Sequence, residues 1–371
     1  MEYHYFDNAA TTRIASGALE AYNRTSLDCF ANPSASHSEG HRSAVLLSRC
    51  RQSAASALCA QERSVFFTSG ATESINIVMS SLLCSKRPGR ILISAIEHEA
   101  VAAWTGFLRE KGWTVDTVPA RGGFISPSDV YDMTDSQTRL VAVMAVNNVL
   151  GTIQDIRSIA EAVRARERES GRPILFFSDC VQALGKTGLR PGQLDIDAAS
   201  FSGHKIHGPR GVGILYLKKG TIQVPSHAGG QESGIRGGTE NLPAIAALAA
   251  AMEALDSADQ QKVTVWNRLI RETCLECGIE VLSPDRDCTP YILSIATRLP
   301  SEVALRMLQD RGCLVSAGSA CSNNARGKAE AVYRAAGFQK AAGNAIRVSF
   351  SQDNTDEEVE ELAGALRSLV S

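Results

Sequence analysis

Short apolar segments alternate with helical stretches from about residue 63 onward. Four segments are too continuously apolar for either face to meet water, so we predict buried strands at residues 64–70, 90–95, 139–148 and 173–179. Between them, apolar residues recur at helical spacing: Ile75, Val78, Met79 and Leu82, and then Ile156, Ile159, Ala160 and Val163. This alternation predicts an α/β fold with a mainly parallel sheet that helices cover on both faces.

Polar residues follow the carboxyl ends of the predicted strands. They are Ser69-Gly70-Ala71-Thr72, Glu97-His98, Asn147-Asn148 and Ser178-Asp179. Open α/β sheets bind ligands at the carboxyl ends of their strands, so we expect these four segments to line one crevice. The charged run at 164–172 is better interpreted as a solvated helix end that Gly171 closes.

A second region follows an alanine-rich helix that begins near residue 241. We expect a break near 256–261, then a strand at 291–297, a helix at 301–309, a strand at 345–351 and a C-terminal amphipathic helix. A chain of 371 residues exceeds the usual size of a single core. We therefore predict a large domain over 15–258 and a smaller α+β domain formed by 1–14 and 259–371.

Composition and charge narrow the classes of partner. The net charge of −2 gives no electrostatic reason to expect nucleic acid or an anionic membrane as a partner. The N-terminus has no signal-like apolar stretch, and the most apolar segment, 242–255, is too short for a membrane span. Ten cysteines without dense spacing fit a reducing compartment, so we expect a cytoplasmic protein with a small ligand.

Lysine is scarce, with nine lysines against 29 arginines, yet Lys205 stands inside "SFSGHKIHGPRGVGILYL" at 200–217. A lysine at a strand end is normally a surface residue. Here a helix start at 69–72 offers free N–H groups, and Asp179 ends a buried strand. An amine, an acid for a cationic ring nitrogen and an anion site together suit pyridoxal phosphate, although Asp179 alone could be an ordinary turn aspartate.

Ten motifs in order carry a resemblance that runs nearly end to end. They are "YFDNAATT", "NPSASH", "FTSGATES", "EHEAV", "NNVLG", "SDCVQALGK", "SFSGHKIHGPRGVG", "GGQESGIRGGTEN", "SAGSACS" and "IRVSFS". With them the chain resembles the cysteine desulfurases, which are class V aminotransferases of the fold-type I pyridoxal phosphate enzymes. The resemblance implies a large domain with a mainly parallel, seven-stranded type of sheet and a smaller α+β domain. "SAGSACS" is similar to the class whose nucleophile lies on a long mobile loop.

The resemblance implies a role for each matching residue. Lys205 would form the Schiff base, Asp179 would pair with the pyridine nitrogen, and His98 would stack on the ring and handle protons. The remaining cofactor contacts would come from Asn148 and Gln182 at the phenolic oxygen, and from Ala71, Thr72, Ser202 and His204 at the phosphate. In the homodimer that the resemblance implies, Thr239 would reach the neighbouring subunit's phosphate.

Cys321 is the expected nucleophile. Gly318 and Asn323-Asn324 predict an exposed loop, where a thiol has no core to fill. A thiol of pKa ~8.5 already provides a few per cent of thiolate at neutral pH. The resemblance implies that Cys321 takes the sulfur of L-cysteine, releases L-alanine, and keeps a persulfide for an acceptor protein in iron–sulfur cluster assembly or thiolation.

Arg347 in "AIRVSFS" is the expected substrate residue, together with Asn148, because a guanidinium group suits a carboxylate. The alternative for Arg347 is a surface arginine at a strand end. A metal at His204 and His207 would compete with the Schiff base at Lys205, and Cys274-x-x-Cys277 has no matching second pair of cysteines. We therefore expect no metal site.

Two other functions stay open on the sequence alone. One is a lyase or aminotransferase of the same fold that acts on another amino acid, such as selenocysteine; the other is a non-catalytic adaptor in sulfur trafficking. The chain also departs from the resemblance where Val149 replaces a usual glutamate after the paired asparagines, and where "SNNARGKAEAVYRAAG" replaces the serine-rich segment after Cys321.

Overall fold

The structure is a computed structural model that describes residues 3–218, 220, 222, 229–255, 260–317 and 326–369, with only the backbone of 326–328. The predicted nucleophile Cys321 lies outside these residues, as do Gly318 and Asn323-Asn324.

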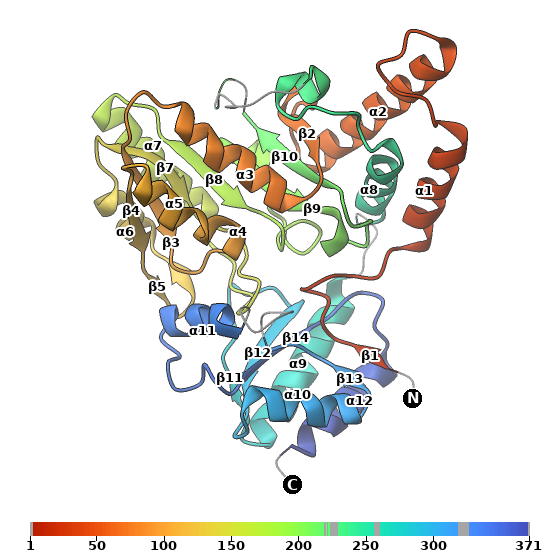
Figure 1. Cartoon of the computed structure of the whole chain (residues 1–371). Helices are drawn as coiled ribbons and strands as arrows, with labels where there is room; N and C mark the ends of the chain where they lie inside the picture. The colour runs from red at the N-terminus through yellow and green to blue at the C-terminus, as the bar shows by residue number, and fades with distance from the viewer. Residues whose placement is uncertain are drawn as a thin grey trace.

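A seven-stranded sheet forms the upper part of the molecule in Figure 1. Its strands, in spatial order, are β2 (Val65–Thr68), β10 (Gly213–Leu217), β9 (Ala198–Ser202), β8 (Leu175–Asp179), β7 (Thr138–Ala142), β3 (Arg90–Ser94) and β4 (Thr114–Val118). Only β10 runs against its neighbours. The predicted α/β fold with a mainly parallel sheet is confirmed.

Helices cover both faces of this sheet because consecutive strand residues are apolar on both sides. Phe66 and Phe177 pack on one face against α3 (Ala71–Ser81), α4 (Glu99–Ala102) and α5 (Trp104–Glu110). Phe67 and Phe176 pack on the other face, in the core that includes α2 (Ser38–Ala57), α6 (Pro127–Met133), α7 (Ile156–Ser170) and α8 (Leu242–Leu255). Helix α1 (Ser16–Asp28) packs on α8.

The predicted strand at 139–148 is too long, since β7 ends at Ala142. The N–H groups of Val143 and Ala145 still bond to β8, but the chain then turns. The turn forms because the Asn147 side-chain oxygen accepts the N–H groups of Val149 and Leu150 at 2.9 and 2.8 Å. This turn brings Asn148 to the carboxyl end of the sheet.

A smaller unit, at the bottom of Figure 1, contains both ends of the described chain. Its sheets are β11 (Glu280–Val281), β12 (Ile292–Ala296) and β14 (Ala345–Ser349), and the parallel pair β1 (His4–Tyr5) and β13 (Cys313–Leu314). Its helices are α9 (Gln260–Glu276), α10 (Ser301–Asp310), α11 (Arg326–Ala335) and α12 (Asp356–Arg367). Its core combines Phe6 with apolar residues between 263 and 369. The division at 14/15 and 258/259 stays a prediction.

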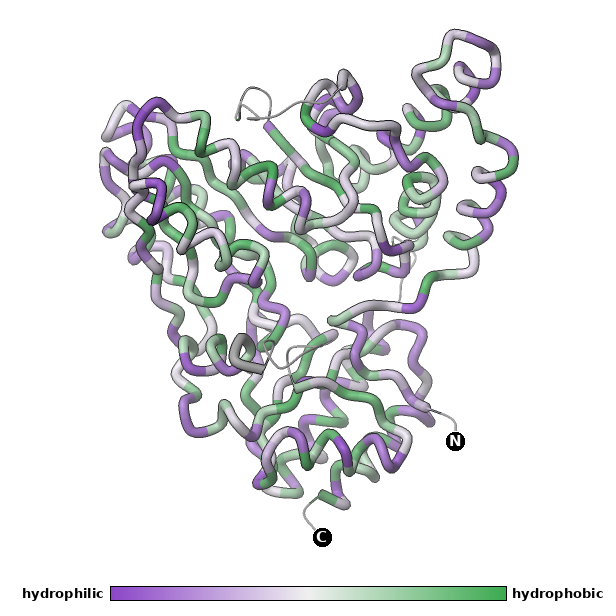
Figure 2. The backbone as a smooth tube through the Cα atoms, in the orientation of Figure 1, coloured by the Kyte–Doolittle hydropathy of each residue, from purple (hydrophilic) through white to green (hydrophobic). Residues whose placement is uncertain are grey.

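Hydrophobic positions lie mostly inside both units, and polar ones mostly at their surfaces (Figure 2). A short antiparallel pair, β5 (Ala120–Arg121) and β6 (Phe124–Ile125), connects β4 to α6. Among the helices of the described residues, none combines the length and the apolar character that crossing a membrane requires.

Candidate active site

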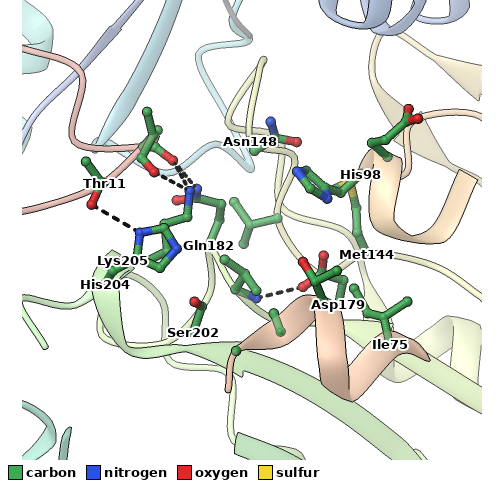
Figure 3. Close-up of a pocket in the computed structure, with 18 of the residues that line it drawn as sticks. Thr11, Ile75, His98, Met144, Asn148, Asp179, Gln182, Ser202, His204 and Lys205 are labelled. Carbon is green, nitrogen blue, oxygen red and sulfur yellow. Dashed lines mark hydrogen bonds between the residues drawn. The ribbon is translucent and has the colours of Figure 1, made fainter. Parts of the chain in front are cut away.

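A cavity of about 690 Å³ opens at the carboxyl ends of β2, β3, β7, β8 and β9. The structure brings ten of the predicted site residues together around it: Ala71, Thr72, His98, Asn148, Asp179, Gln182, Ser202, His204, Lys205 and Arg347. They come from segments far apart in sequence, as the crevice predicted from the strand ends requires. Figure 3 shows several of them converging on the cavity.

Lys205 ends a short 3-10 turn, Gly203–Lys205, directly after β9. Its Nζ donates to the carbonyl oxygens of Ala9 and Ala10 at 2.8 and 2.7 Å (Figure 3). Burial, and then the charge of Arg347, lowers the pKa of Lys205 to about 8. An appreciable share of Lys205 is therefore a neutral, nucleophilic amine near neutral pH.

Asp179 ends β8 and is 4% exposed. Its Oδ1 accepts from the backbone N–H of Val181 at 3.1 Å and from the Ser200 hydroxyl at 3.0 Å. Burial raises the pKa of Asp179, because the charged form loses hydration and the nearby His98 and Lys205 offset only part of that loss. A bound cationic ring nitrogen would restore that charge.

Glu97 is a buried carboxyl group of this cavity that the sequence placed at a strand end of the crevice but to which it assigned no role. Its Oε1 accepts from Ser94 Oγ and Met144 N, both at 2.6 Å, while its Oε2 has no hydrogen-bond partner among the described residues. Burial raises the pKa of Glu97 to about 8. At neutral pH it is mostly uncharged and does not compete with Asp179 for a cation.

The N-terminus of α3 lies at one end of the cavity and has the N–H groups that an anion would need. Gly70 precedes the helix at φ +154°, a conformation that favours glycine, and the N–H groups of Ala71 and Thr72 have no acceptor within the helix. Ser202 and His204 line the same cavity. Burial and then Lys205 lower the pKa of His204 to about 4, and its Nδ1 lies 3.1 Å from Thr11 Oγ1.

His98 precedes α4 and projects into the cavity from the end of β3 (Figure 3). Its Nδ1 accepts the N–H of Ala100 at 3.1 Å, which in the neutral ring leaves the proton on Nε2. On the other side, the Gln182 amide donates to Ala9 O at 2.9 Å and accepts from Lys186 Nζ at 2.7 Å.

Arg347 is 2% exposed, so the alternative of a surface arginine is wrong. Its Nη2 pairs with Asp7 at 2.6 Å and its Nη1 donates to the carbonyl of Asn148 at 2.8 Å. Val149, which replaces the expected glutamate, is buried in the apolar core and also lines the cavity. The cavity wall is therefore uncharged at that position.

Two predicted site residues are not among the described residues that line this cavity. Thr239 is described but does not line it, and Cys321 lies outside the described residues. His207 turns away, with Nδ1 3.0 Å from Arg13 O and Nε2 3.1 Å from Ser351 Oγ. Within the described ranges, no cluster of three or more histidine, cysteine and acidic side chains could hold a metal ion.

The residues present fit pyridoxal phosphate. The cavity lies within the ~300–1,000 Å³ range of small-ligand pockets and combines a buried carboxyl group, a largely buried lysine and a helix N-terminus beside a glycine. An α/β sheet with these groups at its strand ends defines a fold-type I pyridoxal phosphate enzyme.

Comparison with known proteins agrees with this class. Residues 4–362 match the family described as Aminotransferase class-V. A cysteine desulfurase of Cereibacter sphaeroides is 36% identical over all of this chain and 96% of its own length. Among solved structures, a NifS-like protein is 32% identical with a TM-score of 0.90, covering 99% of this chain and 98% of that one.

A second solved structure, "SspA in complex with cysteine", is 30% identical with a TM-score of 0.82, over 95% of this chain and all of that one. The chain belongs to the class-V aminotransferase family and, within it, to the cysteine desulfurases. Its cofactor is pyridoxal phosphate.

Proposed function

We propose that this enzyme converts L-cysteine to L-alanine and collects the sulfur as a persulfide on Cys321. The observation that carries the proposal is the presence of Lys205 and Asp179 in one cavity, where the amine has a pKa of about 8. The similar structure titled as a cysteine complex supports L-cysteine as the substrate.

Lys205 and Asp179 would hold the cofactor at two different groups. The Lys205 amine would bind its aldehyde carbon, and the Asp179 carboxylate would pair with its ring nitrogen. When bound, pyridoxal phosphate supplies an aldehyde that condenses with amines and a ring that withdraws electrons. The N–H groups at the start of α3, together with Ser202 and His204, would bind the phosphate. His98 would cover the ring face and hold a proton at Nε2.

Arg347 would bind the substrate carboxylate together with Asn148. Asp7 and the Asn148 carbonyl already fix two guanidinium nitrogens, so the orientation of Arg347 is set before a substrate arrives. Such preorganisation reduces the entropy lost on binding.

Cys321 would attack the sulfur atom of the bound cysteine as a thiolate. The new S–S bond forms as the substrate Cβ–S bond breaks, and the released carbon takes up the proton that Cys321 lost. One thiol of the enzyme and one cysteine thus give one persulfide and one alanine, with no external oxidant. An acceptor protein of iron–sulfur assembly or thiolation would then take the sulfur.

We also propose a homodimer with shared sites. Thr239 is exposed and does not line its own chain's cavity, and it lies between Gly237-Gly238 and the start of α8, which supports a contact with the neighbouring subunit's phosphate. A cytoplasmic location is supported by the free thiols of all nine cysteines that the structure describes.

The experiment is to measure alanine formed from L-cysteine and to label the persulfide by mass spectrometry. We expect one alanine per persulfide on Cys321 in a single turnover, and neither product with Lys205→Ala. Cys321→Ser should still bind cysteine without forming the persulfide. Alanine formation by Cys321→Ser at the wild-type rate would contradict the role of this thiol, and no alanine from the unsubstituted protein would favour the adaptor. Selenocysteine as competing substrate tests the remaining alternative.

A further inference from the structure

Lys186 is a buried lysine next to the cavity that the proposed chemistry does not use. Its side chain reaches Gln182, where Nζ donates to Oε1 at 2.7 Å, and the residue is 8% exposed. Among the ion pairs of the described residues, none includes Lys186. Burying an ammonium group without a carboxylate partner costs free energy, so the presence of a lysine at position 186 requires an explanation.

The surroundings of Lys186 add to that cost. Burial, followed by the charges of Lys205 and Arg347, lowers the pKa of Lys186 to about 7. Gln182 provides the acceptor that offsets part of the loss of hydration.

The contact with Lys186 decides which end of the Gln182 amide faces the cavity. A glutamine has one acceptor end and one donor end, and the two can exchange by a flip of the amide. In its ammonium form Lys186 has donors only, so Oε1 faces it at 2.7 Å. The Nε2 end then points to Ala9 O at 2.9 Å, the same oxygen that Lys205 Nζ contacts at 2.8 Å.

Gln182 therefore meets the cavity with its donor end beside Lys205 (Figure 3). Nε2 carries two hydrogens, and Ala9 uses one of them. The second can serve an oxygen of a bound ligand. With the amide flipped, the same place would hold an acceptor that repels an anionic oxygen.

We propose that Lys186 is a positioning residue, which holds the Gln182 amide so that it offers a hydrogen-bond donor to the phenolic oxygen of pyridoxal phosphate. This inference rests on the proposed function for the identity of that oxygen. It concerns cofactor binding, and it does not depend on which amino acid the enzyme converts.

The test is cofactor affinity, measured by equilibrium dialysis of pyridoxal phosphate against cofactor-free full-length protein. Lys186→Met and Gln182→Met should each weaken binding about tenfold, the worth of one hydrogen bond to a charged group. The double variant should be no weaker than either single one. Lys86→Met, at an exposed lysine away from the cavity, is the matched control and should bind like the unsubstituted protein. Additive losses, about a hundredfold together, would overturn the proposal.

A cofactor analogue without the phenolic oxygen separates positioning from a merely structural role. Lys186→Met should bind this analogue as well as the unsubstituted protein does, and an equal loss for analogue and cofactor would overturn the proposal. If Lys186→Met does not fold, Lys186→Arg decides: affinity within about threefold of the unsubstituted protein supports positioning, and affinity as weak as that of Gln182→Met overturns it. Normal cofactor binding without alanine formation would refute the proposed function and leave this inference standing.

Discussion

The buried amine of Lys205 sets a pH dependence that an ordinary lysine would not show. Its pKa of about 8 means that the neutral, reactive form grows as pH rises through 8, whereas an exposed lysine changes near ~10.4. We expect the rate of pyridoxal uptake by cofactor-free protein to rise between pH 7 and 9 and then level off. This rate is measured by stopped-flow absorbance as the bond between Lys205 and the aldehyde forms. Pyridoxal is used instead of pyridoxal phosphate, so that no phosphate group titrates in this pH range.

Lys205→Ala is the control, because it reports the slow reaction of other amines. The rate of the variant is subtracted from that of the unsubstituted protein. If the difference continues to rise above pH 10, the lowered pKa of Lys205 is contradicted.

Arg347 combines a proposed role in substrate binding with a structural contact, and its variants must separate the two. Arg347→Ala removes the proposed carboxylate partner and should weaken L-cysteine binding by about 10- to 100-fold. It also leaves Asp7 without its 2.6 Å partner and should lower the melting temperature. Asp7→Asn is the matched variant, since it removes the ion pair and keeps Arg347.

Spectroscopic titration with L-cysteine and thermal unfolding provide the two measurements. A similar loss of cysteine affinity in Arg347→Ala and Asp7→Asn would assign Arg347 a structural role only.

At the scale of elements, one buried ion pair anchors the turn Gln231–Gly234 to α2, and a further hydrogen bond ties the turn to β2. The Glu232 carboxylate is fully buried and accepts from Arg51 Nη1 and Nη2 at 2.7 and 2.6 Å, and it accepts the Phe67 N–H at 2.8 Å. Glu232 and Ser233 have φ of 45° and 54°, which strains the turn. These bonds hold the strained turn seven residues before Thr239.

Arg51→Met should therefore destabilise the protein by roughly 3–5 kcal/mol, because it leaves a buried carboxylate without its cation. Adding Glu232→Gln should recover part of the loss, since the neutral amide still accepts the Phe67 N–H. Thermal unfolding of the single and double variants measures both effects. A double variant less stable than Arg51→Met would show that the ion pair is not the anchor.

Sequence patterns predicted several elements whose buried faces are apolar and missed elements such as α2, whose buried face is not. Helix α2 buries Gly40, Ser43, Leu47, Cys50 and Ala54 at helical spacing, but three of these are small or polar and give little hydropathy signal. Within the site, motifs identified Lys205 and Asp179. The contacts of the Ala9 and Ala10 carbonyls with Lys205 could not be predicted, because every residue has a backbone carbonyl and the residue type does not show which ones face the site. The ion pair between Arg347 and Asp7 could not be predicted either, because it joins positions 340 residues apart.

At the scale of the whole molecule, the N-terminal segment links the two units at the site. Asp7 lies beside Ser349 of the smaller unit and pairs with Arg347, while Ala9 and Ala10 hold Lys205 of the large sheet. A change in how the two units pack would therefore move the amine and the guanidinium group together. The site described so far still lacks the contact that we assign to a second subunit.

Mixed dimers test whether Thr239 acts across the subunit boundary. Thr239→Val should weaken cofactor binding about tenfold by removing one hydrogen bond to the phosphate. In a dimer of one Lys205→Ala subunit and one Thr239→Val subunit, the site with an intact Lys205 receives an intact Thr239 only if the residue serves its neighbour. Differently tagged subunits can be co-expressed, and the mixed dimer isolated by both tags. We expect wild-type cofactor affinity at one site per mixed dimer, measured by absorbance titration. If every site of the mixed dimer binds the cofactor with weakened affinity, Thr239 belongs to its own subunit's site. A monomer that binds the cofactor with full affinity would show that no partner subunit is needed.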